Sequence, residues 1–212
     1  MDLDGTLVDT EPHWIAAEMA LVTRFGGTWS HEQALQLVGM GLGDSSLVLQ
    51  AQGVQLTVPE IVDLLTDEVT ERLSGGVAWR PGALELLAEV REAGVPAALV
   101  TMSVRRMAQV IVAAVPFDAF DLIVSGSDVT RPKPDPQAYL TAAEQLGVDI
   151  TRSVAIEDSP PGLAAAVASG AVTVGVPHLR ELPAGPGWEL WPTLTGRTLA
   201  DLRAVAAARE TA

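Results

Sequence analysis

Acidic, basic and hydroxyl side chains follow short apolar runs at several points of the chain. The first carboxylates, Asp2 and Asp4, stand at the very start of the sequence. The full set of candidate chemical groups is Asp2, Asp4, Thr101, Lys133, Glu157 and Asp158. In open parallel sheets, ligands bind beyond the carboxyl ends of the strands. We therefore expect these groups to converge at one edge of a sheet.

The residue types in this set suit phosphoryl transfer. Carboxylates that lie close together repel, and one of them takes up a proton unless a cation intervenes. Mg²⁺ relieves such repulsion with only a few protein oxygens. The remaining groups are a carboxylate nucleophile, a second carboxyl two residues later, a lysine and a hydroxyl, which match the needs of phosphoryl transfer. Phosphate monoester hydrolysis is so slow without a catalyst that the site must supply about 20 kcal/mol or more.

Lys133 differs from every other basic residue of the chain. Lys and Arg together number 13, and Lys133 is the only lysine. Lysine presents a compact point charge, whereas arginine presents a planar fork. Lys133 is therefore a candidate for a task that arginine performs poorly.

The elements that must position these groups alternate between short apolar runs and helices. Apolar runs are predicted as buried strands at 95–100, 122–124, 153–156 and 172–176, and helices are predicted at 81–93, 105–115, 135–146, 160–169 and 198–209. This alternation predicts an α/β fold with a Rossmann-like parallel sheet core covered on both faces. Residues 11–78 instead predict four helices, with breaks at Gly26-Gly27, at 39–43 and near Pro59. We expect the third of these helices to be capped by Asp44 or Ser45.

The sequence resembles the haloacid dehalogenase (HAD) superfamily. The run Asp2-Leu3-Asp4-Gly5-Thr6-Leu7-Val8-Asp9-Thr10 resembles the first motif of that superfamily, and Thr101, Lys133 and Glu157-Asp158 resemble the other three in order and spacing. The first motif is highly specific, whereas Thr101 or Lys133 alone is weak. The helical insertion resembles the small cap of the phosphatase and beta-phosphoglucomutase branch. The resemblance implies a core domain of residues 1–10 and 79–212 with an inserted alpha-helical cap domain of residues 11–78.

The resemblance also implies a role for each residue of the set. Asp2 would attack phosphorus and form an aspartyl-phosphate. Asp4 would protonate the leaving oxygen, then activate water, and would bind Mg²⁺ through its backbone carbonyl. Thr101 and Lys133 would bind the phosphate. Asp2 and Asp158 would bind Mg²⁺, with Glu157 sharing that duty or holding a metal-bound water.

Simpler interpretations remain for several polar residues. Glu157-Asp158 could be acids that cap the helix after Pro160. Asp9 and Asp128 are interpreted as structural, and Arg131 as the partner of a surface acid. We expect substrate specificity to come from the cap, through Trp14, His13 and the segment 39–46. The simpler interpretations are a core position for Trp14, a solvated helix-end position for His13 and an ordinary helix–helix connection at 39–43.

Two features depart from the family pattern. In the family an apolar strand precedes the first aspartate, whereas only Met1 precedes Asp2 here. The first core strand is therefore expected to be missing from this chain, and the functional protein is expected to start upstream. The second departure is that residues 38–52 contain no Arg or Lys, which argues against a second phosphate on the substrate.

Three functional hypotheses follow. The first is a Mg²⁺-dependent phosphatase acting on a small phosphorylated metabolite. The alternatives are a phosphosugar mutase of beta-phosphoglucomutase type and a catalytically inactive HAD-like binding module. The missing strand favours inactivity, whereas the intact set of motif residues argues against it.

Composition excludes other classes of partner. The net charge of −14 leaves no basic patch for nucleic acid, and an anionic membrane surface would repel the chain. The absence of cysteine excludes disulfides and thiol chemistry. Without a signal peptide or an apolar run long enough to span a bilayer, we expect a cytoplasmic location. No sequence pattern predicts the oligomeric state.

Overall fold

The computed structural model describes residues 1–210 and has an α/β fold, as predicted. Its elements, in chain order, are α1 (Glu11–Arg24), α2 (His31–Leu35), α3 (Leu42–Ala51), α4 (Val58–Leu73), α5 (Ala83–Glu92), β1 (Ala98–Val100), α6 (Arg105–Ala114), β2 (Leu122–Val124), the 3₁₀ turn Gly126–Asp128, α7 (Gln137–Leu146), the 3₁₀ turn Ile150–Arg152, β3 (Val154–Glu157), α8 (Pro160–Ser169), β4 (Val172–Gly175), β5 (Glu189–Leu190) and α9 (Leu199–Glu210).

The strands form two parallel ladders. β1 pairs with β2, with Leu99 opposite Ile123, and β3 pairs with β4, with Ile156 opposite Val174. β5 adds a short parallel edge to β4. Helix α7 packs against β1 and β2, and α8 packs against β3 and β4. Parallel strands covered in this way are buried, which explains why they appear in the sequence as short apolar runs.

Met1 and Asp2 join the two ladders. The amino nitrogen of Met1 donates to the Ala98 carbonyl at 2.9 Å, and the Val100 N–H donates to the Met1 carbonyl at 2.9 Å. On the other side, the Asp2 N–H donates to the Ile156 carbonyl at 3.0 Å. Among residues 1–210, the backbone of Met1 and Asp2 is thus what lies between β1 and β3.

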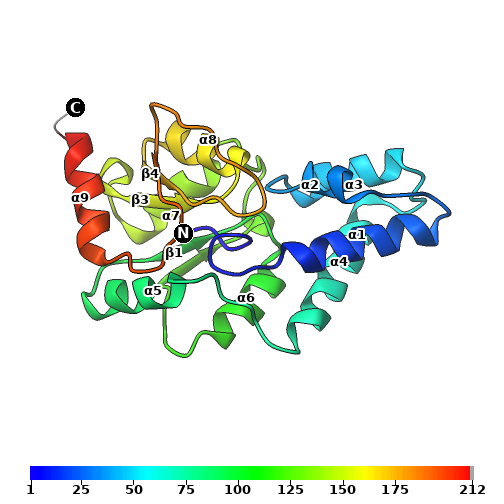
Figure 1. Ribbon diagram of the computed structural model, residues 1–212, viewed down its shortest axis with the longest axis horizontal. Helices are drawn as coiled ribbons and strands as arrows, with labels where there is room; N and C mark the ends of the chain where they lie inside the picture. The colour runs from blue at the N-terminus through cyan, green and yellow to red at the C-terminus, as the bar shows by residue number, and fades with distance from the viewer. Residues whose placement is uncertain (211–212) are drawn as a thin grey trace.

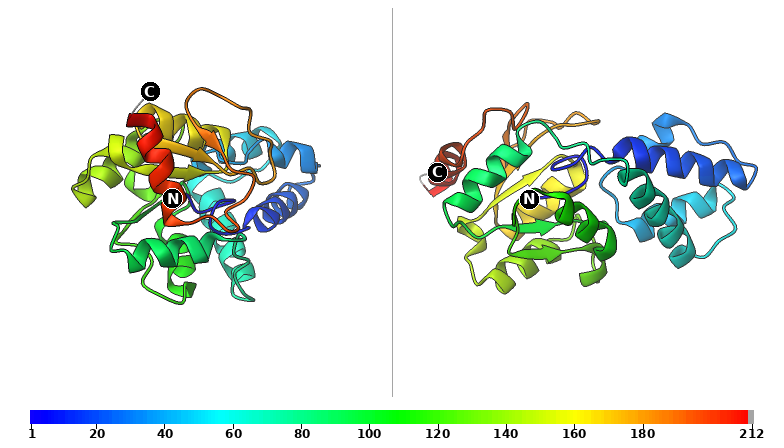
Figure 2. Two further views of the ribbon diagram at one scale, coloured as in Figure 1. Left: turned by 60° about the vertical axis from the view of Figure 1, so that its left-hand side comes forward. Right: turned by 90° about the horizontal axis from the view of Figure 1, so that it is seen from below.

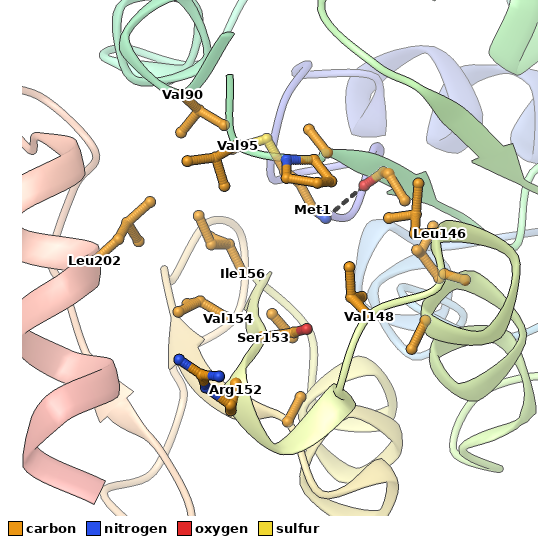
Figure 3. A pocket seen from close by; sticks show the side chains of 18 of the residues that line it. Met1, Val90, Val95, Leu146, Val148, Arg152, Ser153, Val154, Ile156 and Leu202 are labelled. Atoms are coloured by element: carbon orange, nitrogen blue, oxygen red, sulfur yellow. Dashed lines mark hydrogen bonds between the residues drawn. The ribbon is translucent and has the colours of Figure 1, made fainter. Parts of the chain in front are cut away.

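A cavity of about 520 Å³ lies beside Met1, between the two ladders and α9. Figure 3 shows its mainly apolar lining, including Val95, Val154, Ile156 and Leu202. None of the six predicted site residues lines this cavity. An apolar lining of this kind gives a charged phosphate few hydrogen-bond partners, so we place the chemistry elsewhere.

Helices α1 to α4 gather at one end of the molecule and pack mainly on one another (Figures 1 and 2). The chain enters and leaves this group of helices through two backbone segments that run side by side. The Asp9 N–H donates to the Ala78 carbonyl at 2.8 Å, and the Arg80 N–H donates to the Leu7 carbonyl at 2.9 Å. Neighbouring entry and exit points explain how a long insertion fits between the first motif and β1.

Ion pairs join the helical insertion to the rest of the molecule. Arg106 on α6 bonds Asp63 at 2.9 Å and Asp67 at 3.0 Å, both on α4. All three side chains are substantially exposed, so each pair contributes little stability but helps to set the orientation of α4.

Two elements differ from the sequence-based expectation. Helix α3 begins at Leu42 after Gly41, not after Asp44 or Ser45. Gly41 lies against Pro132, and a Cβ there would come within 2.9 Å of that ring, so the packing leaves no room for a capping side chain at this position. The short strand β5 was not predicted, because two residues are too few to give a periodic signal.

Within residues 1–210, no helix combines the length and the apolar character needed to cross a membrane.

Candidate active site

The site lies where β1 and β3 end, on either side of the Met1–Asp2 backbone. Thr101 follows β1 directly, Glu157 is the last residue of β3, and Asp158 follows it. Asp2 is held between these strands by its own N–H bond to Ile156. The carboxyl ends of both ladders therefore meet at Asp2, as the sequence predicted.

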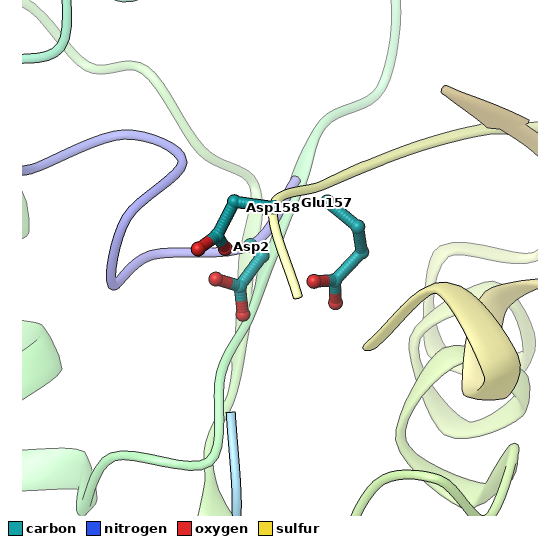
Figure 4. Close-up of side chains that lie close together, drawn as sticks. All are labelled: Asp2, Glu157 and Asp158. Carbon is teal, nitrogen blue, oxygen red and sulfur yellow. The ribbon is translucent and has the colours of Figure 1, made fainter. Parts of the chain in front are cut away.

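Three buried carboxylates form one cluster. Oxygens of Asp2, Glu157 and Asp158 lie within 4.8 Å of one another (Figure 4). The three side chains are almost completely shielded from solvent. Such an oxygen-only set matches the ligands that Mg²⁺ prefers.

Lys133 supplies the positive charge within this cluster. Its Nζ donates to Asp2 Oδ1 at 2.6 Å, to Glu157 Oε1 at 2.6 Å and to the Val100 carbonyl at 2.9 Å. Burial disfavours the charged form of Lys133, but the carboxylates of Asp2 and Glu157 outweigh it and raise its pKa. One ammonium against three carboxylates leaves an excess of negative charge that a divalent cation would balance.

The carboxyl groups respond to this excess of negative charge. Burial, followed by repulsion from Glu157, raises the pKa of Asp2 to about 7. Burial, followed by repulsion from Asp2, also raises the pKa of Asp158 well above its ordinary value. Carboxyl groups in this state hold protons that a bound cation would displace.

Backbone positions around the cluster leave no room for larger residues. Gly5 has a φ of +81°, and a Cβ there would lie 2.2 Å from a carboxylate oxygen of Asp158. At Gly162, on α8, a Cβ would lie 1.9 Å from a carboxylate oxygen of Glu157. Thr6 Oγ1 donates to Asp158 at 3.0 Å and helps to fix its orientation.

The carboxylate of Asp4 is surrounded by hydrogen-bond donors. Oδ2 accepts from Ser103 Oγ at 2.6 Å and from Thr101 Oγ1 at 3.3 Å. Oδ1 accepts from Thr10 Oγ1 at 2.5 Å and from the Trp14 indole N–H at 3.0 Å. Asp4 is therefore oriented by the β1 loop on one side and by the start of α1 on the other.

A cavity of about 70 Å³ connects these groups with the helical insertion. Asp2, Asp4, Thr101 and Lys133 line its core side. The segment 37–40, the start of α3 and the α1 side chains Glu11, Trp14 and Glu18 line the opposite side. Part of the expected specificity segment 39–46 therefore borders the cavity, as Trp14 does, whereas His13 is not among the residues that line it.

The residues interpreted as structural have partners away from the cluster. Asp9 Oδ1 lies 2.8 Å from His178 Nε2, and Asp128 pairs with Arg105 at 2.6 Å. Arg131 pairs with Asp135 at 3.3 Å. Ser159, rather than Glu157 or Asp158, caps α8 by accepting from the Gly162 N–H at 3.2 Å. Glu157 and Asp158 therefore do not cap α8, and both belong to the carboxylate cluster with Asp2.

Four contributors to the site were not among the predicted site residues. Tyr139 donates to Glu157 Oε1 at 2.5 Å from α7, and Ser103 and Thr10 donate to Asp4. Glu11 is buried at the cavity wall, with 5% of its surface exposed. Thr10 ends the run that resembles the first motif and Glu11 follows it, so both could have been considered for that reason, but Tyr139 carries no sequence signal beyond its apolar helix.

The pair formed by Glu18 and Trp29 gives the insertion a pH-dependent stability. Burial raises the pKa of Glu18 to about 7, although the hydrogen bond from the Trp29 indole opposes this shift. The folded protein therefore keeps a proton that the unfolded chain releases from about pH 4.5 upward. Because the folded state binds more protons in this range, the free energy of unfolding falls as the pH rises from about 4.5 to 7.

Between pH 5 and pH 8, we expect the free energy of unfolding to fall by about 1–3 kcal/mol less in Glu18→Gln than in the wild type, because glutamine does not titrate. Urea unfolding of both proteins at several pH values measures this difference. Parallel pH curves for the two proteins would show that Glu18 does not titrate in this way.

The fold and this site together define a class of enzyme. A parallel α/β core, an acid–lysine cluster at the strand ends and a helical insertion after the first aspartates make a haloacid dehalogenase-like hydrolase. The chain belongs to this family, because the family model described as haloacid dehalogenase-like hydrolase matches residues 1–176.

The chain is also similar to individual phosphatases and to solved structures of this family. N-acetylmuramic acid 6-phosphate phosphatase of Pseudomonas aeruginosa is 35% identical over 86% of this chain and 84% of its own length. Hexitol phosphatase A of Escherichia coli is 31% identical over 82% of this chain and 80% of its own length. Among solved structures, CbbY from Rhodobacter sphaeroides in complex with phosphate has a TM-score of 0.85 and 28% identity, covering 95% of this chain and 96% of that one. The chain is a phosphoric monoester hydrolase that acts on a phosphorylated metabolite.

Proposed function

We propose that this enzyme is a Mg²⁺-dependent phosphatase that hydrolyses a small phosphorylated sugar or polyol through a phosphoryl group carried on Asp2. The observation that supports this most strongly is the buried cluster in which Asp2 lies beside Lys133, Glu157 and Asp158. The names of two relatives, an N-acetylmuramic acid 6-phosphate phosphatase and a hexitol phosphatase, favour a carbohydrate-like substrate.

Asp2 is the proposed nucleophile. Lys133 bonds its Oδ1, and within residues 1–210 no hydrogen bond is found to Oδ2, which is the oxygen available for attack. In the first step, a new bond forms between Asp2 and phosphorus while the bond from phosphorus to the ester oxygen breaks. Lys133 and the hydroxyl of Thr101 are placed to bind phosphoryl oxygens, because both line the same cavity as Asp2.

Asp4 is the proposed general acid and base. It gives a proton to the departing ester oxygen and then takes a proton from the water that attacks phosphorus on Asp2. This second step releases phosphate and restores the Asp2 carboxylate. The donors that surround Asp4 hold its two oxygens at fixed positions for both transfers.

The residues present fit a divalent cation. Asp2, Asp158 and the backbone carbonyl of Asp4 would hold Mg²⁺, with Glu157 at one side of the same cluster. When bound, Mg²⁺ supplies positive charge that offsets the negative charge of the phosphoryl group. The raised pKa values of Asp2 and Asp158 support this assignment, since both carboxyl groups lack enough positive charge around them.

Hydrolysis is favoured over mutase chemistry. Lys133 is the only cationic side chain among the described residues that line the cavity, so a second phosphate would find no partner on the side of the insertion. We further propose that residues 11–78 act as a cap domain that closes over the substrate, while residues 1–10 and 79–212 carry the reaction.

Removal of divalent metal should abolish phosphate release. With p-nitrophenyl phosphate as substrate, we expect activity to fall at least about 100-fold in EDTA and to return with added Mg²⁺. The measurement is initial rate against free Mg²⁺ concentration. Full activity in EDTA, after exhaustive dialysis, would contradict the proposed metal dependence.

A further inference from the structure

Glu11 is a buried acid of the cavity wall that the proposed reaction does not use. It is the first residue of α1, and 5% of its surface is exposed. It lines the same cavity as Asp2, Asp4 and Lys133. Within residues 1–210, no side chain or backbone group donates a hydrogen bond to it, in contrast to Asp4 with its four donors.

A carboxyl group that is buried and accepts no hydrogen bond is destabilising. Burial is the main reason why the pKa of Glu11 is raised to about 8. Repulsion from neighbouring acids raises this pKa further, and these acids are Asp4, Glu18, Asp2 and Asp9. Water or substrate must therefore supply the missing hydrogen bonds. Because Glu11 faces the cavity, the part of the substrate that enters there can take this position.

The charge pattern of the cavity determines which part of the substrate meets Glu11. The phosphate belongs near Lys133 and Thr101, where positive charge and a hydroxyl donor are found. Anionic groups would be repelled by Glu11 and by its acidic neighbours. A neutral hydroxyl group can both donate to and accept from a carboxyl group, so it fits Glu11 in either protonation state.

We propose that Glu11 is a specificity-determining residue that hydrogen-bonds a hydroxyl group on the leaving-group side of the substrate. This assignment rests on the proposed phosphatase function and deepens it. It makes Glu11 the group by which the enzyme distinguishes polyol and sugar phosphates from unsubstituted alkyl phosphates. A site built around a hydrogen bond rejects analogues that lack the matching group.

The test compares esters that differ only in their hydroxyl groups. One pair is glycerol 3-phosphate and n-propyl phosphate, and a second is glucitol 6-phosphate and n-hexyl phosphate. For the wild type, we expect kcat/KM to favour the hydroxylated member of at least one pair by about tenfold or more. In Glu11→Met, which keeps the volume but not the hydrogen bond, we expect this preference to fall at least about tenfold. Glu11→Gln, which keeps an acceptor oxygen, should retain part of it.

Glu68→Gln is the matched control. Glu68 is a glutamate of the same insertion, but it does not line the cavity and pairs instead with Arg72 at 2.6 Å. The preference for hydroxylated esters should therefore stay within about threefold of the wild type in this variant. Urea unfolding of all variants verifies that each is folded.

The possible failures can be told apart with p-nitrophenyl phosphate, which has no hydroxyl group. One outcome is that Glu11→Met hydrolyses this ester and keeps the wild-type preference for hydroxylated esters. That outcome would overturn the role of Glu11 but not the phosphatase function. Hydrolysis of this ester without any wild-type preference for a hydroxylated ester would also overturn it. If the folded wild type with Mg²⁺ released phosphate from none of the esters, the proposed function and this assignment would both fall.

Discussion

Asp2→Asn is expected to lower kcat for every phosphate ester by at least about 10³-fold, because the amide cannot attack phosphorus. The substitution is nearly isosteric, and the side chain remains between β1 and β3, where the backbone of Asp2 is fixed by its bond to Ile156. The amide oxygen can still accept the hydrogen bond from Lys133. The loss should therefore appear in kcat, measured as phosphate released per enzyme, and not as unfolding.

Thr6→Ser provides a control beside the same cluster. Thr6 donates to Asp158 through its hydroxyl, and serine keeps that donor. We expect this variant to retain kcat within about tenfold. Residual activity of Asp2→Asn above about one tenth of the wild type would contradict the role of Asp2 as nucleophile.

Lys133→Met is expected to lower the free energy of unfolding by about 3–5 kcal/mol near neutral pH. The methionine fills a similar space but leaves Asp2 and Glu157 facing each other without their shared donor. Removing one partner of a buried ion pair is costly, because the remaining charge has lost its solvation and its partner. Phosphate hydrolysis should fall at least about 100-fold in the same variant, since the phosphate loses its cation.

Urea unfolding in EDTA measures this loss without interference from bound metal. Arg106→Met serves as the comparison, because Arg106 also bonds two carboxylates but lies at the exposed surface. It should lose about 1 kcal/mol or less. Equal losses for the two variants would show that the buried Lys133 pair has no special importance for stability.

The sequence predicted the sheet because buried parallel strands appear as apolar runs between helices. The runs that end at Val100 and Ile156 were enough to place Thr101 and Asp158 at one edge. Lys133 could be singled out because it is the only lysine of the chain. These features are local in the sequence, so they were accessible without a structure.

Features that depend on packing between distant segments were not accessible in this way. Tyr139 reaches Glu157 only because α7 packs across β1 and β2. The hydrogen bond from Trp14 to Asp4 and the burial of Glu11 depend on how α1 is placed against the core. The sequence indicated the insertion as the source of specificity and gave Trp14 two interpretations, as a core residue and as a residue that faces the site. The structure confirms its core position and also shows its hydrogen bond to Asp4, which no local pattern predicts.

The acidic groups of the candidate site destabilise the folded protein when they are charged. Four acidic groups, Asp2, Asp158, Glu11 and Glu18, have pKa values raised mainly by burial. The folded environment disfavours the charged form of each of them relative to water. Such an arrangement is difficult to explain by stability alone, and perturbed groups of this kind cluster at functional sites.

The most direct test of the central claim is to detect the phosphoryl group on Asp2. The wild-type enzyme is mixed with Mg²⁺ and substrate, quenched rapidly in acid, and digested for peptide mass spectrometry. We predict that the peptide containing Asp2 carries one added phosphoryl group in the wild type and none in Asp2→Asn. Steady hydrolysis with the phosphoryl group found on another residue, or with none detectable at saturating substrate and the shortest quench times, would contradict the account.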